Sequence, residues 1–191
     1  MAYLNYLDHV WFEWVQVHVR SSTWDDILVP MRDRFYWMPI YVFVAFWLIL
    51  HHSSRVLPWS IAIILCVVLT DQISSNVLKK SIERIRPCRE DYFKDHFQPA
   101  IKCSNGYSFP STHASNHMGI GSLFYFGFKN DFKKWSYLFL VWAVLVGFAQ
   151  VYVGVHFPSD ILAGFGLGFL IGWLLYIGVI QFSIKKKMPA V

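Results

Sequence analysis

The chain has 191 residues, of which 55% are hydrophobic and only 15% are charged. Soluble domains carry about 25% charged residues, so this composition excludes an ordinary water-facing protein. Aromatic residues make up 19% of the chain, and Trp and Tyr are typical of the membrane–water interface. We therefore predict an all-α fold, a polytopic bundle of membrane helices.

The first predicted element is an amphipathic helix over residues 3–19 that lies in the membrane interface. Its apolar side chains recur at spacings of three and four, which places them on one helical face: Leu4, Leu7, Trp11 and Trp14. Asp8, Glu13 and Gln16 lie off this stripe. We expect residues Thr23 to Asp33 to be a short link to the first span.

Five apolar segments follow, each near the ~20 residues that a membrane-spanning helix needs: roughly 35–51, 58–80, 112–128, 135–152 and 159–182. They predict about five transmembrane helices in one membrane-embedded domain over residues 1–191, with 1–34 as the interfacial helix region. In the last segment Gly164, Gly168 and Gly172 recur every four residues, a spacing that favours close helix packing.

Basic residues predict the orientation. They occur in the short connections and in the tail: Arg55, Lys129, Lys133, Lys134 and Lys185–Lys187. The positive-inside rule places these residues in the cytoplasm. Loop 81–111 and turn 153–158 then share the opposite face. For a bacterial protein we expect a multi-pass protein of the inner (cytoplasmic) membrane, with this face in the periplasm.

Loop 81–111 violates the charge rule, because a dense basic group between Lys79 and Lys102 lies at the outer face. An anionic ligand explains that group better than topology does, so the net charge of +5 predicts no nucleic-acid partner. Arg20, Arg32 and Arg34, near the N-terminus, belong to no motif.

Two cysteines, Cys88 and Cys103, lie in loop 81–111. Outside the cytoplasm we expect them to form a disulfide that closes the loop. The alternative is a pair of free thiols.

Three polar clusters are brought to the outer face by this topology. Lys79-x6-Arg86-Pro87 combines a point charge with a planar fork, which together hold a phosphate well. Pro110-Ser111-Thr112-His113 opens a helix whose free N–H groups form an anion site. Each cluster alone has a simpler interpretation, as interfacial basic residues or as an ordinary helix cap.

The third cluster runs from Gln150 to Asp160. A carboxylate one turn after His156 can orient the imidazole and leave its other nitrogen free to attack or to accept a proton. The simpler interpretation, in which Asp160 only balances the helix dipole, does not explain the neighbouring histidine. Together the three clusters predict a site that binds phosphate, attacks phosphorus and protonates a leaving oxygen.

In order and spacing, these motifs resemble the type-2 phosphatidic acid phosphatase family, which shares its site with the vanadium haloperoxidases. The family pattern is K-x6-R-P, then P-S-G-H, then S-R-x5-H-x3-D. This chain has Lys79…Arg86-Pro87, then Pro110-Ser111-Thr112-His113, then Ala149-Gln150-x5-His156-x3-Asp160. The surrounding helices fit the family's six-helix membrane fold if the N-terminal helix is counted.

The resemblance implies a metal-independent lipid phosphatase without a cofactor, with loop 81–111 as its extracytoplasmic active-site loop. His156 would form a phosphohistidine, Asp160 would orient it, and His113 would be the general acid. The phosphate would be held by five residues: Lys79, Arg86, Ser111, Thr112 and Gln150. The substrate would be a membrane phospholipid, polyprenyl or lipid A phosphate, and nothing in the sequence selects among phosphatidylglycerophosphate, polyprenyl diphosphate and lipid A.

Two departures from the family pattern matter. Thr112 replaces Gly and adds a side chain beside the phosphate. Gln150 replaces Arg and offers a neutral amide in place of a charged fork. We expect Arg84 or Arg89 to compensate; the alternatives are a slow enzyme and a site that only binds. We hypothesise that Gln150 still faces the phosphate.

Two alternatives belong to other functional classes. The first is an intramembrane metal-dependent hydrolase whose ligands are His113, His117, His156 and Asp160. Lys79 and Arg86 would repel such a metal. The second is a non-catalytic or transporter-like protein that binds lipid phosphates. The replacement of the family arginine by Gln150 favours this alternative.

Overall fold

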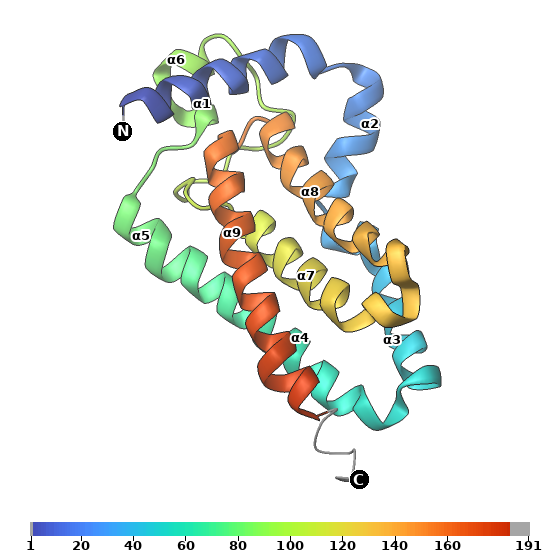
Figure 1. The fold of residues 1–191 in the computed structure, drawn as a ribbon. Helices are drawn as coiled ribbons and strands as arrows, with labels where there is room; N and C mark the ends of the chain where they lie inside the picture. The colour runs from blue at the N-terminus through green and yellow to red at the C-terminus, as the bar shows by residue number, and fades with distance from the viewer. Residues whose placement is uncertain (1, 184–191) are drawn as a thin grey trace.

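The computed structural model describes residues 2–183, and its regular elements in that part are all helical (Figure 1). The main helices are α1 (Ala2–Trp14), α2 (Ser22–Met31), α3 (Met38–His51), α4 (Val56–Asp71), α7 (Thr112–Phe132), α8 (Tyr137–Tyr152) and α9 (Pro158–Leu175). Two one-turn helices follow α4: α5 (Lys79–Ile82) lies at the start of the long loop that leads to α7, and α6 (Asp91–Lys94) lies within that loop. The predicted all-α bundle is confirmed.

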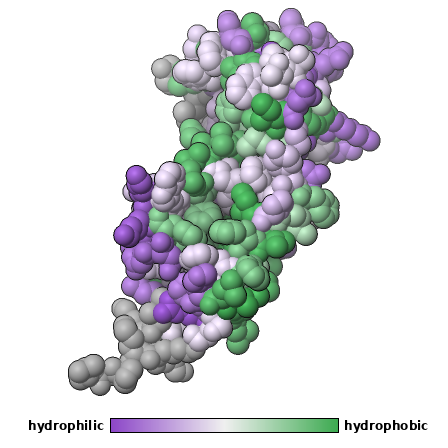
Figure 2. Space-filling model, turned by 90° about the vertical axis from the view of Figure 1, so that its right-hand side faces the viewer, coloured by the Kyte–Doolittle hydropathy of each residue, from purple (hydrophilic) through white to green (hydrophobic). Residues whose placement is uncertain are grey.

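Among residues 2–183, three helical runs are long and apolar enough to cross a membrane: Ser53–Ile82, Thr112–Tyr152 and Pro158–Gln181. The second run reverses at Lys133, where φ is +50°, so that α7 and α8 lie side by side (Figure 1). A bent pair, Ser22–Met31 with Phe35–His51, is a fourth candidate. Figure 2 shows apolar side chains between two polar ends on one face of the molecule. The count of five spans stays a prediction.

The N-terminal region differs from its prediction. Residues 23–33, expected to be a link, lie largely within helix α2, whose N-cap Ser21 accepts a hydrogen bond from the backbone N–H of Trp24 at 3.4 Å. Helix α1 lies across one end of the bundle (Figure 1). Its predicted apolar stripe faces outward at Trp11, whereas Asp8 is buried against the protein. The side chain of Leu4, a predicted member of the stripe, lies outside the described part of the structure. The basic tail 185–187 lies outside it as well.

Helices α7 and α9 are in backbone contact along the predicted row of glycines. A Cβ added to Gly164 would lie 2.7 Å from the carbonyl oxygen of Ser111, and one added to Gly168 would lie 2.8 Å from the backbone nitrogen of Gly119. This contact brings the first turns of both helices together, where the N–H of Ser111 donates to the carbonyl oxygen of Asp160 at 3.0 Å.

We predict that Gly168→Ala destabilises the protein by about 2 kcal/mol, because the added methyl group overpacks the α7–α9 contact. Gly166→Ala on the same helix is the matched control, since nothing lies within 4 Å of its added Cβ. Thermal unfolding in detergent measures the difference. Equal melting temperatures for the two variants would contradict the close-packing interpretation.

Candidate active site

A cavity of about 550 Å³ lies where the three motifs meet. Six of the eight predicted site residues line it: Lys79, Arg86, Thr112, His113, Gln150 and His156. Ser111 and Asp160 are fully buried and do not line the cavity. The wall also includes residues outside the predicted set: Arg32, Asp33, Asp71, Ser75, Ile101, Lys102, Ser104, Asn116, His117 and Val155.

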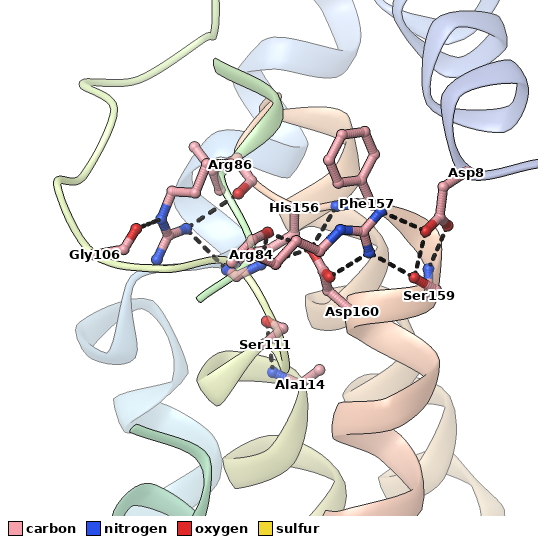
Figure 3. A network of polar contacts seen from close by, with 12 residues as sticks. Asp8, Arg84, Arg86, Gly106, Ser111, Ala114, His156, Phe157, Ser159 and Asp160 are labelled. Atoms are coloured by element: carbon pink, nitrogen blue, oxygen red, sulfur yellow. Dashed lines mark hydrogen bonds and ion pairs between the residues drawn. The ribbon is translucent and has the colours of Figure 1, made fainter. Parts of the chain in front are cut away.

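His156 lies in the turn between α8 and α9 and is 2% exposed. Its Nδ1 is 3.4 Å from Oδ2 of Asp160, in the first turn of α9. That oxygen also accepts hydrogen bonds from the backbone N–H of Phe157, at 2.8 Å, and from the hydroxyl of Ser108 (Figure 3). Asp160 therefore fixes the imidazole plane and directs Nε2 toward the cavity.

Burial lowers the pKa of His156 to about 4. The contact with Asp160 opposes this shift, and the positive charge of Arg86 adds to it. The imidazole is therefore neutral at pH 7. Because the carboxylate favours a proton on Nδ1, Nε2 carries the lone pair that a nucleophile needs.

Arg86 is the cation nearest to that lone pair. Its Nη1 lies 3.0 Å from Nε2 of His156 and donates to the carbonyl oxygen of Val155 at 3.1 Å, while its Nε donates to that of Gly106 at 2.8 Å (Figure 3). The side chain is held from two loops and is 7% exposed. It is placed to contact any anion that His156 attacks.

The start of α7 supplies the second histidine. Ser111 caps the helix by accepting a hydrogen bond from the N–H of Ala114 at 3.4 Å. The hydroxyl of Thr112 turns toward Ser74 and Ser75, both at 3.1 Å, so the residue that replaces the family glycine is tied to the helix before the loop. His113 lines the cavity one residue further on.

Gln150 lines the cavity, and its contact with a phosphate stays a hypothesis. It is fully buried, its Nε2 donates to the carbonyl oxygen of Val146 at 3.5 Å, and its Oε1 has no partner among residues 2–183. The expected compensation by Arg84 or Arg89 is wrong, because neither residue lines the cavity. Arg89 instead donates to the carbonyl oxygen of Asn105 at 2.7 Å.

Arg84 does not line the cavity, but it connects Asp160 to helix α1. Its Nη1 donates to Oδ1 of Asp160 at 2.8 Å, and its Nη2 donates to Oδ2 of Asp8, in α1, at 2.7 Å (Figure 3). Asp8 also accepts from the backbone N–H of Ser159 at 2.8 Å. Sequence reasoning missed this role, because Asp8 was recognised only as a polar residue off the apolar stripe.

The structure joins Cys88 and Cys103 in a disulfide with a Cα–Cα distance of 6.1 Å. The bridge closes the segment that follows Arg86 and precedes Ser108. It therefore restrains two of the residues that approach the His156–Asp160 pair from loop 81–111, Arg86 and Ser108.

The metal-site alternative lacks the required geometry. Within residues 2–183, no three His, Cys, Asp or Glu side chains are grouped as metal ligands. Nδ1 of His117 lies 2.9 Å from the carbonyl oxygen of His113, and its buried Nε2 has no partner in the described part of the chain.

We predict that His156 couples stability to pH. The unfolded imidazole binds a proton near pH 6.5 and the folded one near pH 4, so the contribution of His156 to stability falls as pH decreases between these values, by about 3 kcal/mol. His156→Gln removes this group, and its melting temperature in detergent should fall less over the same window. Identical pH dependence in both proteins would contradict the buried, neutral imidazole.

Comparison with known proteins identifies the family. Residues 59–183 match the family model of the PAP2 superfamily. The chain is 29% identical over 162 residues to a lipid A 4'-phosphatase of Bacteroides thetaiotaomicron, covering 83% of this chain and 71% of the relative. It is 39% identical over 124 residues to phosphatidylglycerophosphatase B of Bacillus subtilis, covering 61% of this chain and 57% of the relative.

The fold agrees with that match. A crystal structure of a transmembrane PAP2-type phosphatidylglycerolphosphate phosphatase from Bacillus subtilis superposes with a TM-score of 0.75 at 24% identity, covering 100% of this chain and 90% of that one. The family match covers more than half of the chain and includes all three motifs. The chain belongs to the PAP2 superfamily.

Proposed function

We propose that this chain is a membrane lipid phosphatase, which removes phosphate from a lipid headgroup through a phosphohistidine at His156. The observation that carries the proposal is the single cavity that His156 shares with His113, Lys79 and Arg86. A neutral nucleophile, a proton donor and two cations meet there. The cavity volume of about 550 Å³ lies within the range of small-molecule sites.

The reaction has two steps. First, Nε2 of His156 attacks phosphorus, the bond from phosphorus to the leaving oxygen breaks, and His113 donates a proton to that oxygen. Then water attacks phosphorus, the phosphorus–nitrogen bond breaks, and His113 takes a proton from the water. Inorganic phosphate leaves, and both histidines return to their starting states.

Charge and hydrogen-bond donors stabilise the phosphate in both steps. Arg86 contacts Nε2 of His156. When the substrate binds, the guanidinium of Arg86 passes to the phosphate oxygens and frees the lone pair. Lys79, the Gln150 amide and the N–H groups at the start of α7 hold the remaining oxygens. Asp160 keeps the proton on Nδ1 and orients the ring.

An apolar groove supports a lipid substrate. It has a volume of about 400 Å³ and lies between α3, α4 and α7. Asp71 and His117 line the phosphate cavity, while Val67 and Ile120, about one helical turn further along α4 and α7, line the groove. The two spaces therefore follow the same pair of helices, and we assign the groove to the lipid's apolar chain.

The site belongs on the periplasmic face of the inner membrane in this proposal. The connections that hold Arg55 and Lys133 are neighbours at the far end of the bundle, where Nε2 of His52 lies 3.2 Å from Oδ1 of Asp131. The positive-inside rule assigns that end to the cytoplasm. A disulfide beside the cavity agrees with an oxidising compartment.

We predict phosphate release from at least one of three lipids by purified protein in detergent: phosphatidylglycerophosphate, a polyprenyl diphosphate or lipid A. His156→Ala should lower kcat/KM by roughly 10³-fold or more, because the nucleophile is lost. His18→Ala, at an exposed position on the N-terminal segment, is the control and should match wild type. Activity should also survive a strong chelator.

Two results would reject this proposal. One is full activity of His156→Ala. The other is lipid-phosphate binding by wild type without hydrolysis of any of the three lipids, which would favour the transporter-like alternative.

Gln150→Ala should lower kcat/KM about fivefold, the effect of one neutral hydrogen bond to the phosphate. Gln72→Ala, at an exposed position in the segment that follows α4, should leave it unchanged. Turnover and affinity that are both unaffected by Gln150→Ala would show that the amide does not contact the substrate.

A further inference from the structure

The family pattern has an arginine at the position of Gln150, and this chain lacks it. The cavity wall contains another arginine, Arg32, that belongs to none of the three motifs. Arg32, the C-cap residue of α2, lines the cavity together with Arg86 and Lys79. Its Nε is buried, and no hydrogen bond or ion pair joins its side chain to any residue in the described range 2–183. A partly buried guanidinium without a counter-ion is costly unless a ligand neutralises it.

The position of Arg32 is built into the fold. At the start of α2, the hydroxyl of Tyr152 lies 2.8 Å from Oδ1 of Asp25 and 3.0 Å from the carbonyl oxygen of Ser21. At its end, Nε1 of Trp37 donates to the carbonyl oxygen of Met31 at 2.5 Å. Both ends of α2 are therefore fixed, and one is fixed to α8, the helix that carries Gln150.

Arg32 lines the same cavity as Arg86 and acts on it electrostatically. Burial lowers the pKa of Arg86, the charge of Asp160 opposes this shift, and the positive charge of Arg32 lowers the pKa further. The adjacent acid, Asp33, attracts the charge of Arg32. Its carboxylate accepts a hydrogen bond from the backbone N–H of Phe35 at 2.9 Å and forms no ion pair with Arg32 within the described residues. Two guanidinium groups that repel each other across a cavity are stabilised by an anion between them.

We propose that Arg32 binds the phosphate oxygens in place of the arginine missing at position 150, so that the N-terminal segment completes the active site. A guanidinium on α2 offers the same planar fork that a family arginine on α8 would offer. The inference rests on the proposed function for its substrate. Its test therefore includes a readout that needs no turnover.

The activity test compares four variants on a lipid that wild type hydrolyses. Arg32→Ala should lower kcat/KM about 10²-fold, the effect of losing one charged donor to the phosphate. The kcat/KM of Arg32→Lys should lie between those of wild type and Arg32→Ala. Arg89→Ala removes an exposed guanidinium in loop 81–111 and should leave kcat/KM unchanged. Adding Gln150→Arg to Arg32→Ala should recover at least ~10-fold, because the fork returns from the other wall.

The binding test titrates inorganic phosphate into each purified protein by calorimetry. Arg32→Ala should raise the Kd at least ~10-fold, with a melting temperature close to that of wild type, and Arg89→Ala should leave the Kd unchanged. This readout separates the two claims. Wild type without activity on any lipid rejects the proposed function, whereas the phosphate Kd still decides the role of Arg32.

Two results would overturn the inference. The first is Arg32→Ala with the phosphate affinity of wild type. The second is a double variant that melts like wild type and yet recovers neither kcat/KM nor phosphate affinity. If the double variant fails to fold, the phosphate affinity of the single variant decides the question.

Discussion

The backbone contact between α7 and α9 sets the position of the proposed catalytic groups. Small residues let the two helices approach until their first turns are joined by the hydrogen bond from Ser111 to Asp160, 3.0 Å long. The free N–H groups of α7, its His113, and the His156–Asp160 pair then face one another. Because both helices begin here, the positive ends of two helix dipoles meet beside the same cavity, which suits the charge of a phosphate.

Helices α1 and α2 do more than cover this end of the bundle. Arg84 donates to both Asp160 and Asp8, and its guanidinium carbon is 4.2 Å from the centre of the Phe157 ring. Helix α1 is thereby coupled to the carboxylate beside His156, the proposed nucleophile. Helix α2 brings Arg32 to the cavity wall. The segment that precedes the family match thus contributes twice to the site. Asp8 binds Arg84, which holds Asp160, and Arg32 lines the cavity.

Local patterns in the sequence predicted the helices and motif positions well, because apolar length and helix-start residues are local signals. Residues far apart in the chain were harder to place. Arg84 and Arg89 were expected to compensate for Gln150, but Arg84 donates to Asp160 and Asp8, and Arg89 donates to Asn105. Arg32 was missed because it follows a helix that the sequence did not predict, one with Pro30 inside it. Its neighbours in the cavity come from distant segments.

The most direct test of the account is identification of the residue that accepts the phosphoryl group. Brief reaction with a lipid labelled in its phosphate, quenching in base and peptide mass spectrometry would locate the adduct. The account predicts an acid-labile, base-stable phosphate on His156 that is absent from His156→Ala. A label on any other residue, or single-turnover hydrolysis without labelled protein, would contradict it.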